Sequence, residues 1–357
     1  MEFQNKLLRW FKKRQRPLPW RQRYRPYEVW VSEIMLQQTQ VETALPYFRR
    51  WMRLFPTVKS LAESAEEKVL KAWQGLGYYS RARNLRESAK KIMREHGGVF
   101  PQKFDEILAL KGVGRYTAGA VASIAFNEDR PIVDGNVLRV LSRIYAVKKP
   151  IDLEKNKEFF WALEKRLIPK GRARDFNQGL MELGALICLP QNPRCAVCPI
   201  EKFCAAKKSG SANRYPVRAK KRRTVKVQAA SLVISDGKKF LIQRRPVGRV
   251  MGGLWEFPEW KLSKNKPLAG EAVAKKVHEL GLQAFGPSLE RPHAVGKIHR
   301  SYTRHRETLW VFKSRLADAA PAKSGWPRAW ASREDFKEYP FSSAHAKIVS
   351  MIEGSDS

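Results

Sequence analysis

All four cysteines of this 357-residue chain lie in one stretch, "CLPQNPRCAVCPIEKFC", and the rest of the sequence has none. They are Cys188, Cys195, Cys198 and Cys204, with the spacing C-x6-C-x2-C-x5-C. Four thiolates this close together can surround one tetrahedral metal ion or one cubane cluster. Such clustering indicates a metal site in a reducing compartment rather than a disulfide framework. The spacing leaves zinc and iron–sulfur both open, but it requires a compact loop over residues 188–204.

The hydrophobic pattern before the end of this loop predicts a helical domain. Residues 1–206 carry helical signals without a strand pattern, so we expect an all-α fold. Ser60 and Glu63, in "SLAESAEEKVLKAWQGL", have the spacing of a capping box at a helix start. Further helices are expected at 81–96, 102–109, 115–125, 135–146, 154–168 and 174–187.

The character of the chain changes after residue 206. Residues 207–227 are polar and basic, which is typical of a solvated linker, although the same cations could follow a DNA backbone. Residues 228–352 predict a smaller α/β domain. Its signals are a hairpin at Asp236-Gly237, a strand in "ETLWVFKS" and a short helix in "GEAVAKKVHELG" that ends at Gly281.

The net charge restricts the class of partner. Lys and Arg outnumber Asp and Glu by 69 − 34 = 35. A field of this sign attracts polyanions, and nucleic acid is favoured because neutralised phosphates release counterions. An anionic membrane surface is the alternative, but the sequence has no long apolar run and no secretory signal peptide. We therefore expect a cytoplasmic, monomeric protein that binds DNA and not membranes.

The stretch "LKGVGRYTA" predicts a phosphate-binding turn. A helix-like segment precedes Gly112 and Gly114, and another follows them. Two glycines permit backbone geometry that a Cβ resists, so the turn can aim its N–H groups, and the next helix N-terminus, at one phosphate. A helix-hairpin-helix motif holds the DNA backbone in this way without reading sequence. The pattern resembles that motif over residues 102–137.

The cysteine spacing, the Gly-Val-Gly hairpin and the stretch "VDGNV" together resemble the endonuclease III / MutY superfamily of DNA glycosylases, over about residues 3–350. The resemblance implies one [4Fe–4S] cluster on the four cysteines, with a structural role. Lyase-competent relatives have a lysine nucleophile where this chain has Tyr116, and a phenol cannot form a Schiff base. Tyr116 therefore indicates base removal without efficient strand cleavage; packing in the helical core is the alternative reading.

Removal of a purine from deoxyribose needs a proton donor near the base and negative charge near the sugar. Glu33 is the candidate acid, because apolar residues such as Val29 and Trp30 lie at helical spacing around it and an apolar wall raises a carboxyl pKa. A solvated surface glutamate is the alternative. The segment "SEIMLQQTQV" resembles the MutY stretch whose glutamate is catalytic, and this resemblance assigns that role to Glu33.

Asp134, in "IVDGNVLRVLSR", is the candidate for the negative charge. Its position before a helix is that of an N-cap, a structural role that could coexist with catalysis. The resemblance assigns this aspartate to stabilising the oxocarbenium-like state of the sugar. It also implies that Asn136 orients water or the sugar.

Other resemblances concern DNA contacts. Gln38, in "LQQTQ", is similar to the residue that enters the duplex beside the lesion. Leu76 and Tyr78, in "GLGYYSRARNL", resemble a wedge that fills the gap left by a flipped base, with helix-end packing as the alternative for the tyrosine. Trp20 and Arg21, in "PLPWR", match the neighbourhood of the adenine pocket.

The segment "MGGLWEFPEWKL" resembles the opening of a Nudix (MutT-like) domain. An active Nudix box clusters carboxylates to hold Mg²⁺. Here Ala274, Lys275 and His278 stand where Arg, Glu and Glu are expected, and only Glu279 remains. The resemblance therefore implies a lost hydrolase that is kept as a module for recognising 8-oxoguanine.

The lesion-contacting loop of this family often reads Phe-Ser-His. The matching segment here offers Tyr302, Thr303 and Arg304, which keeps an aromatic ring and a hydroxyl but replaces the histidine. An ordinary basic strand flank is the alternative. The departure puts the detailed contacts to the lesion in doubt more than the domain itself.

Together these features favour a MutY-type adenine DNA glycosylase acting on adenine opposite 8-oxoguanine, and opposite guanine, in duplex DNA. The alternatives are a thymine or uracil mismatch glycosylase, an endonuclease III-like lyase, a non-catalytic iron–sulfur DNA-binding protein and an active nucleotide hydrolase. The "SEIMLQQT" stretch counts against the first and Tyr116 against the second. The pairing of Glu33 with Asp134 counts against the third, and the missing carboxylates count against the last.

Overall fold

The computed structural model describes the chain in four ranges, residues 2–219, 224–302, 304–317 and 326–353. Contacts divide the chain into two units, the first made of Met1–Glu63 with Asn84–Lys221 and the second of Ser64–Arg83 with Arg222–Ser357. The second unit therefore includes a short segment from the helical part of the sequence. One lesion-contact candidate, Thr303, lies outside the described residues.

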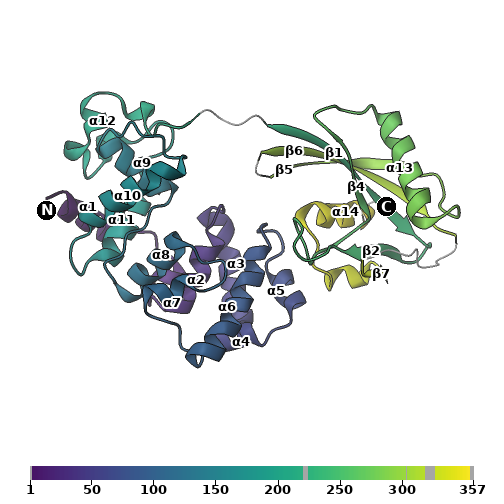
Figure 1. The fold of residues 1–357 in the computed structure, drawn as a ribbon, viewed down its shortest axis with the longest axis horizontal. Helices are drawn as coiled ribbons and strands as arrows, with labels where there is room; N and C mark the ends of the chain where they lie inside the picture. Colours follow the sequence, from purple (N-terminus) through teal and green to yellow (C-terminus); the bar gives the residue numbers. More distant parts are fainter. Residues whose placement is uncertain (1, 220–223, 303, 318–325, 354–357) are drawn as a thin grey trace. The chain divides into compact units, whose positions relative to one another are not determined.

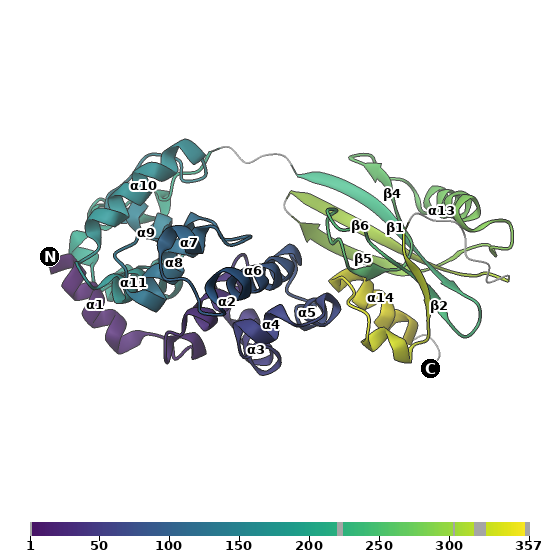
Figure 2. The same cartoon turned by 60° about the horizontal axis from the view of Figure 1, so that its bottom comes forward.

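The first unit consists of helices joined by short turns (Figures 1 and 2). They are α1 (Glu2–Arg14), α2 (Pro26–Met35), α3 (Val41–Leu54), α4 (Val58–Ala62), α7 (Phe104–Leu108), α8 (Arg115–Phe126), α9 (Gly135–Ile144), α10 (Glu154–Leu167), α11 (Ala173–Leu186) and α12 (Ala205–Lys208). Helix α5 (Glu66–Ala72) belongs to the second unit, and α6 (Ser80–His96) crosses the division. The all-α class is confirmed, and the helices predicted from residue 81 onward agree to within two residues at each end.

Local residues set where these helices start. Pro26 is the first residue of α2, where its fixed φ suits a helix and its missing N–H is not needed. Helix α4 starts after Thr57, whose hydroxyl accepts from the Ser60 N–H while the Ser60 hydroxyl accepts from the Thr57 N–H. The capping box predicted for Ser60 and Glu63 is therefore wrong, because Ser60 is already the third residue of a helix that Thr57 caps.

The hairpin between α7 and α8 uses its two glycines differently. Gly112 has a φ of 78°, and a Cβ there would lie 2.4 Å from Nδ2 of Asn84, so only glycine fits. Gly114 is the N-cap of α8 with an ordinary φ of −97°. Beyond its chain neighbours, no atom of the described residues lies within 4 Å of the place of its Cβ. The expectation of special backbone geometry is correct for Gly112 and wrong for Gly114.

Packing among four helices supports the functional site. Helices α1, α9, α10 and α11 share a buried cluster that includes Val137, Leu141, Phe160, Phe176 and Leu180. Helix α8 packs against both α2 and α11, and its residues from Thr117 to Ile124 are all buried. The result is that α2 and the N-termini of α8 and α9 are held by a common core.

The second unit is built on a seven-stranded mixed sheet (Figure 1). Its strands are β1 (Val225–Ser235), β2 (Phe240–Arg244), β3 (Trp255–Glu256), β4 (Glu259–Lys264), β5 (His293–Tyr302), β6 (His305–Arg315) and β7 (Arg328–Ala331). The order is β3-β2-β1-β6-β5, with β4 also paired to β1 and β7 to β2. Strands β1 and β6 are parallel over their whole lengths. The hairpin predicted at Asp236-Gly237 joins β1 to β2 and is confirmed.

Two helices cover the faces of this sheet, α13 (Gly270–Phe285) and α14 (Ser343–Glu353). Ala229 of β1 packs in the cluster that contains α14, and its neighbour Ala230 packs in the cluster that contains α13. The prediction that α13 ends at Gly281 is wrong, since the helix continues to Phe285. A Cβ at Gly281 would lie 2.5 Å from Leu289, so this glycine permits close packing instead of ending the helix.

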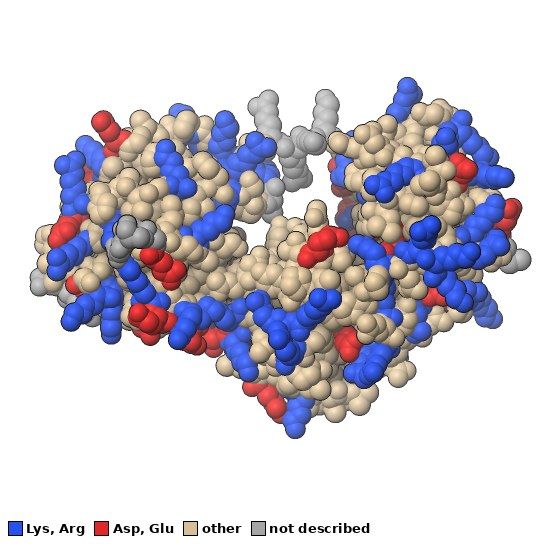
Figure 3. Space-filling view, turned by 180° about the vertical axis from the view of Figure 1, so that it is seen from behind, with Lys and Arg blue, Asp and Glu red and all other residues tan. Residues whose placement is uncertain are grey.

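The charged residues of the chain are mostly basic. On the face drawn in Figure 3, Lys and Arg outnumber Asp and Glu, as the net charge of +35 requires. Within the described ranges, no helix combines the length and the apolar character that crossing a membrane demands.

Candidate active site

A cavity of about 530 Å³ in the first unit gathers most of the candidate catalytic residues. The turn Pro19–Arg21, α2, α8 and the start of α9 all reach it. Its lining includes six residues singled out from the sequence, namely Trp20, Arg21, Glu33, Tyr116, Asp134 and Asn136. Helix α11 adds Gln178, Met181 and Glu182.

Glu33 is buried in this cavity with only 4% of its surface exposed. The Tyr116 hydroxyl donates to Glu33 Oε2 at 2.7 Å. Burial raises the pKa of Glu33 to about 7; the Tyr116 hydrogen bond opposes the rise, Asp134 adds to it, and Arg21 opposes it. The carboxyl group therefore keeps its proton at a pH where a solvated glutamate would be ionised.

Tyr116 stays protonated beside this carboxyl group. Burial, followed by the nearby charges of Glu33 and Asp134, raises the pKa of Tyr116 well above its usual value. Its O–H therefore serves as a donor, and since it donates to Oε2 of Glu33, the glutamate proton is left on Oε1. Met181 completes the contact, with Sδ at 3.7 Å from the phenol oxygen.

Asp134 has the structural role that its position in the sequence predicted, and it also faces the cavity. It is the N-cap of α9, because Oδ1 accepts from the Val137 N–H at 2.7 Å. Its Oδ2 accepts from the Asn136 side chain at 2.9 Å. Burial raises the pKa of Asp134, while the hydrogen bonds from Val137 and Asn136 and the charge of Arg139 lower it. Val137, Asn136 and Arg139 therefore favour the ionised form of Asp134, as Tyr116 and Arg21 favour that of Glu33.

Asn136 and Arg139 join Asp134 to the cysteine loop. The Arg139 guanidinium donates to Asn136 Oδ1 at 2.7 Å and to the Cys188 carbonyl at 2.7 Å. It also donates to the Gly184 carbonyl at 2.8 Å. A Cβ at Gly184 would lie 2.6 Å from Cβ of Asn136, so the end of α11 approaches α9 closely. The loop that follows α11 is thus part of the support of the cavity.

The four cysteines lie between α11 and α12, and all are partly buried free thiols. Burial raises the pKa of the Cys198 thiol to about 12, and the other three thiols add to the rise, so the four sulfur atoms lie near one another. The buried Arg143 guanidinium donates to Cys188 Sγ at 3.2 Å and to the carbonyls of Leu189 and Pro190. A cationic donor beside the sulfurs suits a site that binds as thiolates.

The spread of these sulfur atoms bears on what they could hold. Among the described residues, only Glu256, Glu259 and His345 bring three possible ligand atoms within 4.8 Å of one another. No three of the four cysteine sulfurs therefore lie within 4.8 Å of one another. A single zinc ion with Zn–S bonds of about 2.3 Å would need them about 3.8 Å apart. A cluster with several metal atoms fits this donor set better than one zinc ion.

Sequence reasoning missed the ionic group beside Trp20. Glu182 is 1% exposed and receives hydrogen bonds from Arg16 and Arg21 at 2.9 Å each. Arg21 also donates to Gln178 at 3.0 Å. Although burial acts to raise the pKa of Glu182, the hydrogen bonds from Arg16 and Arg21 lower it to about 2. The available signal was two polar residues, Gln178 and Glu182, four apart on an otherwise apolar stretch of α11.

Other candidates lie outside this cavity. Gln38 is in the turn between α2 and α3, with a φ of 59°. Leu76 and Tyr78 precede α6 in the second unit. Leu76 is 7% exposed, whereas Tyr78 is 47% exposed and has a φ of 48°. Only the tyrosine of this pair is available at the surface. Gly112 and Gly114 are in the hairpin described above.

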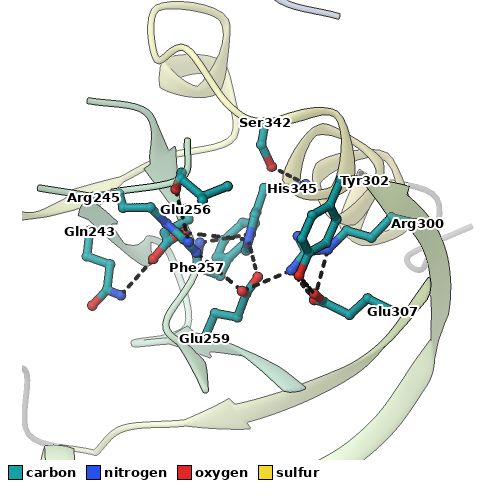
Figure 4. Close-up of polar contacts among 11 residues, drawn as sticks. Gln243, Arg245, Glu256, Phe257, Glu259, Arg300, Tyr302, Glu307, Ser342 and His345 are labelled. Atoms are coloured by element: carbon teal, nitrogen blue, oxygen red, sulfur yellow. Dashed lines mark hydrogen bonds and ion pairs between the residues drawn. The ribbon is translucent and has the colours of Figure 1, made fainter. Parts of the chain in front are cut away.

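In the second unit, Tyr302 ends β5 and lines a cavity of about 550 Å³ together with Tyr78 and His305. Its ring stacks on that of His305, with centroids 5.2 Å apart. Arg304, exposed, leads into β6. The Tyr302 hydroxyl belongs to a buried ionic network, where it donates to Glu307 at 2.5 Å (Figure 4).

This network is an ion-pair system and not a metal centre, although it holds the three grouped ligand atoms noted above. Arg300 bridges Glu307 and Glu259, and Arg245 bridges Glu256 and Glu259. His345 Nδ1 accepts from a backbone N–H, so its Nε2 carries the proton and donates to Glu259 at 3.0 Å (Figure 4). Two guanidinium groups already neutralise the carboxylates that a cation would need.

The helix expected to carry a Nudix box also lacks the groups for Mg²⁺. Helix α13 carries Ala274, Lys275, His278 and Glu279, of which only Glu279 has a carboxylate. That side chain is exposed. One solvated carboxylate does not make a diphosphate-activating metal site.

Comparison with known proteins defines the class. Residues 31–165 match the family model of the HhH-GPD superfamily of base excision DNA repair proteins, and residues 229–351 match that of the NUDIX domain. A thermostable thymine-DNA glycosylase is 30% identical, with a TM-score of 0.54, covering 58% of this chain and 95% of that one. Endonuclease III in a trapped DNA complex shares the fold, at 23% identity and a TM-score of 0.50 over 58% of this chain and 94% of that one. The molecule is a DNA glycosylase, an enzyme that hydrolyses N-glycosidic bonds.

Curated relatives give the family more narrowly. Adenine DNA glycosylase of Homo sapiens is 33% identical over 99% of this chain and 74% of the relative. That of Rattus norvegicus is 33% identical over 98% and 78%, and that of Arabidopsis thaliana is 38% identical over 85% and 56%. The chain belongs to the adenine DNA glycosylase family.

Proposed function

We propose that this enzyme removes adenine paired with 8-oxoguanine, and adenine paired with guanine, from duplex DNA and leaves an abasic site. The observation that carries the proposal is the buried Glu33 carboxyl, held by the Tyr116 hydroxyl at 2.7 Å in the same cavity as Asp134. The pair supplies an acid and an anion with separated proton affinities, which is what purine release requires.

In this mechanism Glu33 protonates N7 of an adenine rotated into the cavity. The C1′–N9 bond then breaks, its electron pair leaves with the purine, and positive charge develops on the sugar. Ionised Asp134 stabilises that charge, with Val137 and Asn136 holding its two oxygens. Water adds at C1′ and gives up one proton to a carboxylate of the site, which restores the starting charge.

The same cavity supports base removal without a lyase step. Strand cleavage through a Schiff base needs an amine nucleophile, and none of the described residues lining the cavity is a lysine. Tyr116 is a hydrogen-bond donor to Glu33 and has no amine to offer. The arginines of the lining are paired with Glu182 and Asn136.

The second unit is proposed to recognise the base opposite adenine. It carries a NUDIX-like fold without the carboxylates for hydrolysis, and Tyr78 and Tyr302 line one of its cavities. Aromatic faces of this kind stack on a purine or fill the place of an extruded base. Arg304 and Thr303 remain candidates for polar contacts with 8-oxoguanine.

Grip on the DNA backbone is assigned to the α7–α8 hairpin. The open space at Gly114, in front of the N-terminus of α8, is suited to a phosphate. Gln38 is the candidate for entering the duplex. The enzyme is proposed to act as a monomer.

We also propose that Cys188, Cys195, Cys198 and Cys204 hold one [4Fe–4S] cluster, supported by the wide spacing of their sulfurs and by Arg143 beside them. The bound cluster would fix the loop that Arg139 ties to Asn136. An optical spectrum of the purified protein tests this, because iron–sulfur proteins are coloured whereas zinc proteins are colourless, and one [4Fe–4S] cluster per chain predicts four iron atoms by metal analysis. Zinc without iron would contradict the proposal.

Single-turnover excision tests the activity. Duplexes carrying adenine opposite 8-oxoguanine, adenine opposite guanine, and thymine opposite guanine are compared, with and without strand cleavage by heat and alkali. We expect adenine to be released fastest from the duplex in which it lies opposite 8-oxoguanine. The DNA strand should be cleaved only after treatment with heat and alkali. Glu33→Gln should lower the rate at least about a hundredfold, because an amide cannot act as an acid. Release of thymine instead of adenine, or a normal rate in Glu33→Gln, would overturn the assignment.

A further inference from the structure

The segment Arg130–Val133 delivers Asp134 to the start of α9 through a narrow, buried passage. Ile132 is fully buried and Val133 is 9% exposed. Helices α8, α10 and α11, which lie together in the first unit (Figure 2), each supply one constraint on this segment. The position of Asp134 therefore depends on how these helices hold the four residues before it.

Two of the constraints act on the first half of the segment. Asn177 of α11 donates to the Arg130 carbonyl at 2.8 Å. A Cβ at Gly119 of α8 would lie 2.5 Å from the Pro131 carbonyl oxygen, so α8 touches the segment with its backbone. Neither contact involves the N–H of Ile132, two residues before Asp134.

The third constraint is Glu164 of α10. Its Oε2 accepts from the Ile132 N–H at 3.2 Å, and its side chain is fully buried. Burial raises the pKa of Glu164 to about 9, with the Ile132 hydrogen bond opposing the rise. The group is therefore a neutral acid at neutral pH, presenting a carbonyl-like acceptor to the backbone. Its Oε1 has no hydrogen-bond partner among the described residues.

A buried acid with an unpaired oxygen is an unfavourable choice for packing alone. An apolar residue of similar size would fill the same space without the cost of desolvating a carboxyl group and leaving one of its oxygens without a partner. What Glu164 supplies and an apolar residue does not is an acceptor for Ile132. That backbone N–H lies two residues before Asp134.

We propose that Glu164 is a positioning residue for the reaction: by accepting from Ile132 it sets the path of residues 130–133 and so the place of Asp134 relative to Glu33. The inference rests on the proposed role of Asp134. Catalysis by two oriented groups is sensitive to small displacements, and a shift of about 1 Å costs about a hundredfold in rate.

The test compares three variants of the full-length protein. Glu164→Leu removes the acceptor, and Glu164→Gln keeps a carbonyl at the same place. Phe160→Leu is the matched control, because Phe160 is fully buried one turn earlier on the same helix and its ring can form no such hydrogen bond. For each we measure the single-turnover rate constant, the fraction of active protein by active-site titration, and the affinity for duplex with an adenine analogue that is not excised.

Glu164→Leu should lower the rate constant about tenfold to a hundredfold while duplex affinity stays within about threefold. Glu164→Gln should recover most of that loss. Phe160→Leu should lower stability and active fraction but not the rate constant of the active molecules. A wild-type rate constant in the active fraction of Glu164→Leu, or a Glu164→Gln as slow as Glu164→Leu, would overturn the proposal.

If Glu164→Leu does not fold, Glu164→Asp replaces it, because the shorter acid cannot reach Ile132 without moving the segment. If the wild type releases a base other than adenine, the same rate constants are measured on that base. The proposed substrate then fails while the role of Glu164 is still decided.

Discussion

The two carboxyl groups of the cavity hold their protons with different strength, and this difference is a property of single residues. Glu33 meets an apolar environment and one hydroxyl donor. Asp134 meets a helix N-terminus and the Asn136 side chain. Burial raises the pKa of both groups, and the Val137 N–H, the Asn136 side chain and Arg139 oppose the rise at Asp134. On this basis the proposed reaction uses Glu33 as the proton donor and Asp134 as the anion.

The excision rate should therefore fall as pH rises through about 7, the pKa of buried Glu33, since only the protonated acid can donate. The Tyr116 hydrogen bond opposes the rise in that pKa, so Tyr116→Phe should move the midpoint of the pH–rate profile to higher pH. Single-turnover rates between pH 5 and 9 check both statements. A midpoint that stays in place, or moves to lower pH, would show that the hydroxyl does not govern the proton on Glu33.

Glu182 gives the opposite sign of pH dependence. Its pKa is lowered to about 2, so its contribution to stability is present above the unfolded-state value of about 4.3 and is lost as pH falls towards 2. Glu182→Gln leaves Arg21 without its buried partner and should cost about 3 kcal/mol at neutral pH. The midpoint of urea unfolding is measured for the wild type and for Glu182→Gln from pH 7 down to pH 3. The difference between the two midpoints should become smaller as the pH falls.

Glu158→Gln is the control for that experiment. Glu158 pairs with Arg115 at the surface, where 73% of its side chain is exposed. Its loss should change stability by less than about 1 kcal/mol. Equal effects of the two substitutions would mean that burial of the Glu182 group does not matter.

At this scale the sequence predicted which residues meet in the cavity better than it predicted their buried partners. Motif resemblance found Glu33, Tyr116 and Asp134, and the structure brings them into one cavity. Glu182 and Glu164 were not predicted from the sequence, because a glutamate in a helix is expected to be solvated unless its partners are known. Those partners, Arg16 and Ile132, are 166 and 32 residues away in the chain.

At the scale of elements, the two glycines of the hairpin between α7 and α8 are expected to have different roles, Gly112 in folding and Gly114 in DNA binding. Gly112→Ala meets both a positive φ and the Asn84 side chain, so it should unfold the hairpin and lower stability by more than about 1 kcal/mol. Gly114→Ala meets neither and should fold normally. If a phosphate sits in the open space there, its added methyl group should weaken binding of any duplex by the same factor, with or without a lesion.

Both variants are tested by measuring their melting temperatures and their affinities for matched and lesion-containing duplexes. Weaker binding of lesion DNA alone by Gly114→Ala would place this residue in base recognition and not in the backbone grip. Unchanged binding of every duplex would remove it from the interface.

Periodicity predicted the helices and most of their ends from residue 81 onward, but two predicted helix ends were wrong, and these two errors have a common cause. The helix start predicted at Ser60 lies three residues earlier, because the capping box is formed by Thr57 and Ser60. At Gly281 the glycine is required by Leu289 in a neighbouring segment. Both ends were set by contacts that a local pattern does not contain, whereas Gly237 lies in a short hairpin loop and was correctly interpreted.

For the whole molecule, the two units carry different parts of the proposed recognition. The acid, the anion and the cysteine loop belong to the first unit, and Tyr302 with its buried ionic network belongs to the second. In that network three carboxylates share two guanidinium groups. The Tyr302 hydroxyl joins the network by donating to Glu307. Buried ion pairs add little net stability compared with apolar packing, so a role in fixing Tyr302 is a physical reason for keeping them.

Glu307→Gln preserves the shape of this side chain but removes the charge that holds Arg300 and the Tyr302 hydroxyl. If Tyr302 reads the base opposite adenine, the preference for adenine opposite 8-oxoguanine over adenine opposite guanine should fall about tenfold, the loss of one hydrogen bond to a charged group. The midpoint of the pH–rate profile should not move, because Glu33 belongs to the other unit. Glu290→Gln removes the same charge from an exposed position of the second unit and should leave the preference intact. A folded Glu307→Gln with the wild-type preference would mean that the network stabilises the second unit without any part in choosing the base.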